Sequence, residues 1–358
     1  MQKTLSKSKK VFAIVSIIIV ILLIALAGYY IYQLFFIPKL TKLEAPTISY
    51  PGQCVVYKCT IQSDGSNVIF GNQSMSASQV TTELQKDMRA IKDAGFDGIR
   101  IEYHFKVSDA SNYLSDRIAL RASQQGLYPV ALLQGCNSKP GNRAFNKEEI
   151  EEWKKFVYDT VSRNKNIIYF WEIWNEPGID LFRYGSPEEF AELLKTTYPI
   201  IKEANSNARV IVTLSAEGRD VSEFQNKVLS SGGGDYFDIL SFHPYGANPY
   251  LQEDLIKESI EREKAIVLKN NNRWPLIIGE IGQPVSEISE EEQARLGKFL
   301  YQEAAKNSIP VTWYYWSDQR LPKDYESIGG GNNWGLIRSD GTPRPILDVI
   351  SIYLESEI

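Results

Sequence analysis

Short apolar segments alternate with amphipathic segments along most of the chain. Runs of about four to eight residues rich in Val, Ile, Tyr and Phe read as buried strands, and the stretches between them place apolar residues at helical spacing. The expected strands cover residues 68–70, 98–103, 128–133, 167–174, 209–214, 237–243, 276–280 and 311–316. Because strands that alternate with helices build βαβ units, this pattern predicts a parallel sheet.

Several of the expected helices begin with capping signals. In each, a Ser or Asn stands three residues before a Glu, and the pairs are Asn146 with Glu149, Ser186 with Glu189, and Ser289 with Glu292. Eight strands alternating with helices predict an α/β fold, a (β/α)₈ TIM barrel over residues 66–358. A doubly wound open sheet has the same alternation, but no Gly-rich phosphate loop follows an early strand.

The N-terminal segment differs because residues 11–32 carry no charge and the apolar run continues to Ile37. About 20 apolar residues span a bilayer as a helix, and the preceding lysines favour a cytoplasmic N-terminus. We expect a basic cytoplasmic tail over 1–10, a transmembrane signal anchor over 11–37, and a linker with an irregular strand over 38–65. The barrel would lie outside the cell, attached to the membrane. The alternative is a signal peptide cleaved after Ala27, which would secrete the barrel.

Composition excludes some classes of function. The formal net charge is −5 although four lysines stand in the first ten residues, so the body is acidic and we expect no nucleic-acid partner. With two His in the chain, we expect no metal site and no cofactor. If the body is extracellular, Cys54 and Cys59 are close enough in sequence to form a bridge, which would leave Cys136 free.

Carboxylates close two of the expected strands. Glu176 follows the fourth strand and precedes a Pro, and Glu280 ends the apolar seventh strand between two Gly. Catalytic groups of a barrel lie at these carboxyl ends of the strands. A Glu within such an apolar strand is costly unless it is paired or functional. Glu102 and His104 lie near the rim of the second strand, where they could contact substrate.

Other strand ends are polar or aromatic. Arg100 lies in the second strand, where a buried guanidinium needs an anionic partner. Glu172 is expected to lie deeper than Glu176 and to form a core ion pair with Arg100. His243 and Tyr245 end the sixth strand and can face the same side. Trp316 ends the eighth strand, either as core or as a platform for a sugar ring.

These features together resemble a family. The run 174–177, Trp-Asn-Glu-Pro, with Glu280 at the seventh strand, resembles the (β/α)₈ clan of retaining glycosidases that includes cellulases, mannanases and β-xylosidases. The segment 334–345 is similar to the stretch that leads into the last helix of many members. The resemblance covers residues 66–355 and indicates the clan rather than one family within it.

The resemblance implies a reaction. Glu176 would be the general acid/base, protonated at rest, and Glu280 the ionised nucleophile, with the two carboxyl groups about 5–5.5 Å apart. Asn175 would donate a hydrogen bond to the sugar 2-hydroxyl. The remaining matched positions would support these groups: Arg100, His243 and Tyr245 would orient Glu280, and Trp316 would be the platform.

The expected function is therefore hydrolysis of β-glycosidic bonds in an extracellular polysaccharide or oligosaccharide by double displacement. A transglycosylase acting on a surface glycan would use the same residues, with a sugar in place of water. A catalytically inactive carbohydrate-binding barrel is the third alternative, and it predicts loss of a catalytic Glu. Nothing in the sequence demands an oligomer, so a monomer is expected.

Overall fold

The computed structural model describes residues 50, 52–57, 61–63, 68–70, 73–106, 109–135, 143–216, 221–245, 251–286, 288–320 and 333–356. They belong to one compact unit, Lys42–Ile358. The expected basic tail, the expected anchor and much of the expected linker lie outside the described residues. Within the described ranges, no helix has the length and hydropathy needed to cross a membrane.

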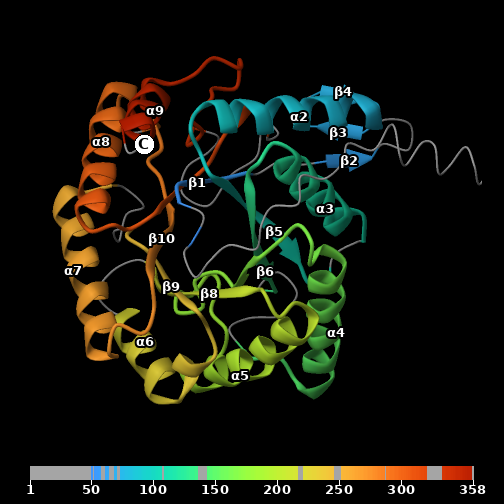
Figure 1. Ribbon diagram of the computed structural model, residues 1–358, viewed down its shortest axis with the longest axis vertical. Helices are drawn as coiled ribbons and strands as arrows, with labels where there is room; N and C mark the ends of the chain where they lie inside the picture. The colour runs from blue at the N-terminus through green and yellow to red at the C-terminus, as the bar shows by residue number, and fades with distance from the viewer. Residues whose placement is uncertain are drawn as a thin grey trace, which may run out of the picture. The chain divides into compact units, whose positions relative to one another are not determined.

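Eight parallel strands close into a barrel, as the alternating pattern predicted (Figure 1). Around the barrel each strand pairs with the next, and β1 closes the ring by pairing with both β5 and β11. The barrel strands are β1 (Cys54–Val56), β5 (Gly98–His104), β6 (Tyr128–Gln134), β7 (Phe170–Ile173), β8 (Arg209–Ala216), β9 (Ile239–His243), β10 (Leu276–Ile281) and β11 (Val311–Trp313). The carboxyl ends of these strands form one rim, which is where a barrel carries its functional groups.

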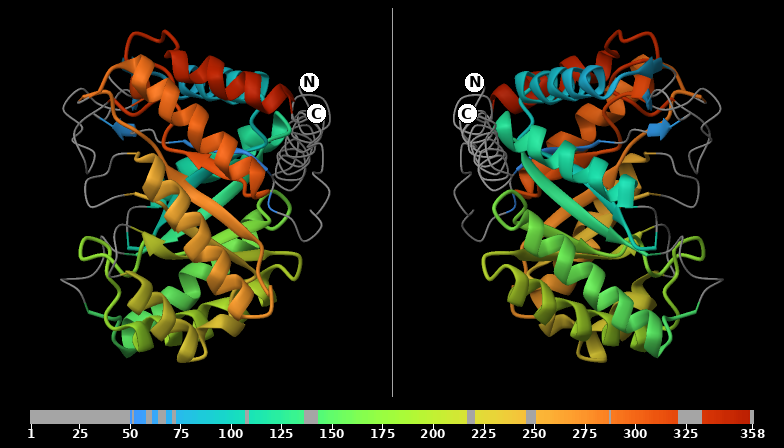
Figure 2. Two further views of the ribbon diagram at one scale, coloured as in Figure 1. Left: turned by 90° about the vertical axis from the view of Figure 1, so that its left-hand side faces the viewer. Right: turned by 90° about the vertical axis from the view of Figure 1, so that its right-hand side faces the viewer.

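Helices surround the barrel, and the side views show them lying along the outside of the tilted strands (Figure 2). They are α2 (Ala77–Asp93), α3 (Asp109–Gln124), α4 (Lys147–Asn164), α5 (Pro187–Ala204), α6 (Val221–Ser230), α7 (Glu253–Lys269), α8 (Glu290–Lys306) and α9 (Pro345–Ser356), with short 3₁₀ turns η2 (Gly233–Asp235) and η3 (Asp318–Arg320). The expected caps are confirmed. Asn146 and Ser186 form capping boxes, and Ser289 accepts a hydrogen bond from the backbone of Glu292.

The prediction of the first strand was wrong. Residues 68–70 form β3 (Val68–Phe70), the middle strand of a separate antiparallel sheet with β2 (Ile61–Ser63) and β4 (Gln73–Met75). The first barrel strand is β1, which lies inside the segment expected to be a linker. Three residues are too few to show an alternating pattern, and β1 is defined by its pairing with strands distant in sequence. The side sheet is thus an insertion between β1 and α2.

Apolar side chains fill the amino-terminal half of the barrel interior. This lower layer consists of Cys54, Val130, Phe170, Ile211, Ile239 and Ile277, together with Tyr50 and Tyr169. The Cys54 thiol is free and fully buried there, so it does not form the bridge that the sequence allowed. Burial raises the pKa of this thiol far above its ordinary value. Cys59 and Cys136 lie outside the described residues.

Candidate active site

Inside the barrel, polar side chains replace apolar ones two residues beyond the lower layer, toward the carboxyl ends of the strands. Residues two apart in a strand face the same side of a sheet. Glu172, Thr213 and Ser241 therefore lie directly above Phe170, Ile211 and Ile239 of the lower layer. With Arg100 of β5 they form a buried set that we call the polar layer: Arg100, Glu172, Thr213 and Ser241. This layer is the floor beneath the barrel mouth.

Arg100 joins three strand ends through one guanidinium. Its Nε donates to Glu172 Oε2 at 2.7 Å, its Nη1 to Glu280 Oε2 at 2.8 Å, and its Nη2 to Asn175 Oδ1 at 2.9 Å. Burial alone would lower the pKa of this guanidinium, but the carboxylates of Glu172 and Glu280 outweigh burial and raise it. Arg100 is therefore a fixed positive charge beside Glu280, and this is the contact that the family resemblance implied.

Glu172 is confirmed as the core ion pair with Arg100. Its second carboxylate oxygen accepts a hydrogen bond from Thr213 Oγ1 at 2.6 Å. With both oxygens engaged and only 1% of the residue exposed, Glu172 balances the charge of Arg100 and does not face the mouth.

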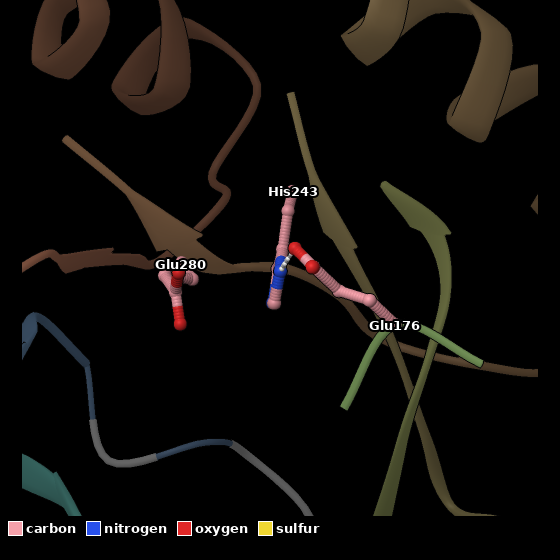
Figure 3. Close-up of side chains that lie close together, drawn as sticks. All are labelled: Glu176, His243 and Glu280. Carbon is pink, nitrogen blue, oxygen red and sulfur yellow. Dashed lines mark hydrogen bonds and ion pairs between the residues drawn. The ribbon is translucent and has the colours of Figure 1, made fainter. Parts of the chain in front are cut away.

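Glu176 meets His243 at the mouth, rather than Glu280 meeting His243 as expected. Nδ1 of His243 and Oε1 of Glu176 are 2.6 Å apart, and Figure 3 shows the two side chains pointing toward each other with Glu280 beside them. On the other side of the ring, Nε2 lies 3.5 Å from Thr213 Oγ1. Because the Thr213 hydroxyl already donates to Glu172, its oxygen can only accept from Nε2–H. If the other ring nitrogen, Nδ1, carries no proton, it can accept a hydrogen bond from a carboxyl proton of Glu176.

The backbone around Glu176 is held in an unusual conformation. Trp174 and Glu176 have φ angles of 64° and 45°, in the left-handed region that residues other than Gly rarely adopt. The Trp174 ring is buried, its Nε1 donates to the Phe182 carbonyl at 2.7 Å, and it packs edge-on against Phe145 and Tyr184. Aromatic packing thus fixes the turn that aims Glu176 into the mouth.

Glu280 enters the mouth from an irregular strand. The register of β10 against β11 shifts between Ile278 and Ile281, and such bulges are frequent where a side chain must be re-aimed. Gly279 allows the close approach of β9, because a Cβ there would come within 2.1 Å of Ser241 Oγ. The Glu280 side chain is 14% exposed, so it can reach a bound ligand.

Aromatic residues line the wall beside Glu280. Tyr245 packs edge-on against Trp334 at 6.2 Å between ring centroids, and Trp334 packs on Tyr314 at 5.4 Å. Burial first, and the Glu280 carboxylate second, raise the pKa of the Tyr245 hydroxyl well above its ordinary value of 10. Tyr245 therefore remains a neutral hydrogen-bond donor beside the expected nucleophile.

Trp316 does not join this wall. It is 3% exposed and packs edge-on against Phe96, which precedes β5. Tyr314 lies nearer the site, since it is among the groups that raise the pKa of Tyr245.

Three side chains could also be read as ligands for a cation. One nitrogen of His243 and one oxygen each of Glu176 and Glu280 lie within 4.8 Å of one another. In this structure His243 hydrogen-bonds Glu176, and the Arg100 guanidinium contacts Glu280. A cation would have to displace the first bond and approach the positive charge of Arg100, so the donor set fits proton transfer better than metal binding.

Comparison with known proteins agrees with this geometry. Residues 59–320, well over half of the chain, match the sequence profile described as Cellulase (glycosyl hydrolase family 5). A search of curated protein sequences found no significant match.

Solved structures with the same barrel include several glycosidases. A family 39 glycoside hydrolase from Bacteroides cellulosilyticus WH2 matches with a TM-score of 0.63 and 20% identity, over 86% of this chain and 64% of that one. A GH5_18 protein from Bifidobacterium longum, in complex with Manβ1-4GlcNAc, matches with a TM-score of 0.61 and 13% identity, over 77% and 73%. Native xylanase 10B from Thermotoga maritima matches with a TM-score of 0.53 and 17% identity, over 77% and 98%.

At these identities the structural matches establish the fold, and this chain spans less than two thirds of the Bacteroides protein. The sequence profile carries the assignment further, because it runs from just after β1 through η3 and so includes the strand ends that bear Arg100, Glu176, His243 and Glu280. The clan expected from the sequence is confirmed, and the chain belongs to glycosyl hydrolase family 5, the family described as Cellulase.

Proposed function

We propose that the protein cleaves β-glycosidic bonds of a polysaccharide or oligosaccharide by a retaining, double-displacement mechanism. The observation that carries the proposal is the spacing of two carboxylates. An oxygen of Glu176 and an oxygen of Glu280 lie within 4.8 Å of each other. Retaining glycosidases hold their carboxyl groups about 5–5.5 Å apart, whereas inverting enzymes separate them by about 6.5–9.5 Å to admit water.

The contacts support distinct roles for the two groups. Glu176, which contacts His243 Nδ1, would protonate the leaving oxygen, while Glu280, which accepts a hydrogen bond from the Arg100 guanidinium, would attack the anomeric carbon. The bond from the sugar to its leaving group breaks as the bond to Glu280 forms. In the second half, Glu176 takes a proton from water, and the water oxygen displaces Glu280 from the anomeric carbon.

Asn175 would assist both steps. Its Oδ1 accepts from Arg100, so its Nδ2 group is left to donate to the sugar 2-hydroxyl. Such a contact strengthens in the transition state, where the ring approaches an oxocarbenium ion.

Azide rescue tests the assignment. For Glu280→Ala, azide should enter the vacated face of an activated aryl β-glycoside and yield the α-glycosyl azide. For Glu176→Ala, the glycosyl-enzyme forms and azide should then yield the β-glycosyl azide. NMR of the wild-type reaction should show the β-anomer first. Glu152→Ala, a surface carboxylate paired with Lys106, is the matched control and should retain wild-type turnover without azide. An α-anomer as first product would refute retention.

We also propose that residues 11–37 anchor the protein in the membrane with the barrel outside the cell. The support is the uncharged apolar run with lysines before it. The full chain and a chain starting at Leu43 would be expressed in parallel and fractionated. The full chain should sediment with membranes at high salt and the shortened one should not. A mature N-terminus at Gly28 would contradict the anchor.

A further inference from the structure

We propose that Glu102, His104 and Gln134 form a subsite that binds the hydroxyl groups at positions 3 and 4 of the sugar held over Arg100. The inference rests on the proposed function and names the part of the substrate that the opposite wall of the barrel recognises. Glu102 Oε2 lies 3.1 Å from His104 Nε2, and their side chains are 27% and 23% exposed, so both can reach a ligand.

The three side chains face the barrel interior. Ile99, Ile101 and Tyr103 pack in the shell between strands and helices, which turns the intervening residues of β5 inward, in line with Arg100. On β6, Val130 belongs to the lower layer, so Gln134 faces the same way four residues later.

Pairing of β5 with β6 brings the three groups together. His104 lies opposite Gln134 in the parallel register, and Glu102 lies one pleat lower on the same face. They therefore form one polar patch at the rim, above Arg100.

The backbone of this patch is fixed from outside. The Asn112 side chain makes two hydrogen bonds to the His104 backbone, at 2.9 and 2.8 Å, and Ser115 Oγ donates to the Glu102 carbonyl at 2.6 Å. Both anchors come from α3 and hold the strand end rather than its side chains. A strand end braced in this way keeps the side chains in place for a ligand.

Gln134 supplies the observation that points to a ligand. It is 5% exposed, and its Oε1 has no hydrogen-bond partner within the described part of the chain. Buried polar atoms are nearly always paired in folded proteins, so an unpaired acceptor at the carboxyl end of a barrel strand marks a position for a donor. A sugar hydroxyl is such a donor.

The order of strands around the barrel indicates which sugar hydroxyls would face this patch. In an eight-stranded ring, β5 and β6 lie opposite β9 and β10, which carry His243 and Glu280. A sugar with its anomeric carbon at Glu280 and its 2-hydroxyl at Asn175 turns carbons 3 and 4 toward the opposite wall, since carbon 4 is across the ring from carbon 1. The acceptors of Glu102 and Gln134 face that edge.

The patch also restricts the class of substrate. Carboxylate and amide oxygens accept from hydroxyls, so the bound unit should be a neutral sugar with a free hydroxyl at position 3 or 4. A sulfate or phosphate ester at that edge would face the Glu102 carboxylate and be repelled.

The test uses the 4-nitrophenyl β-glycoside that the full chain hydrolyses best among the glucoside, mannoside, galactoside and xyloside, with its 3-deoxy and 4-deoxy analogues. Glu102→Gln should lower kcat/KM on the parent sugar by about 10- to 100-fold, as expected for loss of a charged acceptor. On at least one deoxy analogue, the same variant should stay within about two-fold of wild type. Comparing enzymes on one substrate cancels the intrinsic reactivity of that sugar.

Glu152→Gln is the matched control for removal of a carboxylate near the rim, and it should leave all rates unchanged. His104→Asn should reproduce the pattern of Glu102→Gln in weaker form. If Glu102→Gln lowers the rates on parent and deoxy sugars equally, Glu102 acts only through Arg100 and the subsite is refuted. Loss of the subsite leaves azide rescue at Glu280 intact, whereas failure of the proposed function removes azide rescue itself.

Discussion

At the scale of single residues, one guanidinium organises the mouth of the barrel. Arg100 reaches Glu172, Asn175 and Glu280 with three different nitrogens, so it sets the relative positions of a structural carboxylate, an amide and the proposed nucleophile. A Lys carries the same charge but has a single nitrogen on a flexible stem and cannot make this planar set of contacts.

We therefore expect Arg100→Lys to lower the free energy of unfolding by about 3–5 kcal/mol, the range for breaking a buried ion pair. The same variant should lower kcat/KM by about 10²- to 10³-fold, because the charge that orients Glu280 moves. Urea denaturation and steady-state kinetics on an aryl β-glycoside measure the two effects. Arg295→Lys, which alters an exposed pair with Glu292, should cost less than about 1 kcal/mol. Equal losses in both variants would contradict a special role for Arg100.

At the scale of secondary-structure elements, an ion pair stabilises the start of α4. Arg143 forms a two-pronged pair with Glu149, which also caps the helix by accepting from the Asn146 backbone. The hydrogen bond to Arg143 is the main cause that lowers the pKa of Glu149 to about 2, from an ordinary value of 4.5. Phe145, which lies between Arg143 and Asn146, packs against Trp174, so these contacts support the turn that carries Glu176.

A lowered pKa in the folded state means that ionised Glu149 stabilises the fold. That contribution is complete above about pH 4.5 and is lost as the pH falls from 4.5 toward 2. Glu149→Gln should thus lower the Tm at pH 6, and the difference from wild type should shrink toward pH 3, where wild-type Glu149 begins to be protonated. Thermal unfolding at pH 6, 4 and 3 measures this. A Tm difference that stays constant with pH would exclude the ionised pair as the cause.

The helix starts and most of the strands could be predicted, because they depend on residues close together in the sequence. The caps at Asn146, Ser186 and Ser289 follow from residues three apart, and seven barrel strands follow from apolar runs with their ends shifted by a few residues. The eighth, β1, could not be read, because a strand of three residues is specified by its partners β5 and β11 and not by its own pattern.

Some features of the candidate active site could likewise be predicted from the sequence, and others could not. Strand ends identified Glu176, Glu280 and Arg100 as neighbours, since parallel strands bring their carboxyl ends to one rim. The pairing of His243 with Glu176 could not be predicted, because it depends on the left-handed turn at Trp174 and Glu176. The position of Trp316 was also out of reach, because the described chain leaves regular strand geometry after Trp313.

At the scale of the whole molecule, closure of the barrel depends on β1, a strand of only three residues. β1 pairs with both of its neighbours, and the Tyr57 and Trp316 backbone amides extend this pairing toward Arg100 and Val56. The Cys54 thiol on β1 is completely buried in the lower layer, so it reports whether the ring is closed.

In a variant with Cys59→Ser and Cys136→Ser, we expect the remaining Cys54 thiol to be silent toward DTNB in native buffer. Burial shields the sulfur and keeps it protonated, so reaction should follow only on global unfolding in guanidinium. Absorbance of the released thiolate measures the rate. Rapid reaction under native conditions would mean that β1 opens on its own.

The polar layer also decides how this barrel can be made more resistant to heat. Replacing a buried ion network by well-packed apolar side chains is often neutral or stabilising by about 1–4 kcal/mol. Here such a replacement would remove the guanidinium beneath Glu280. Laboratory selection for heat resistance alone would therefore favour stable but inactive variants. Selection for turnover would keep the ion network and the lower melting temperature that it imposes. Variants that improve both properties should carry their changes in the helical shell and the loops, away from the barrel axis.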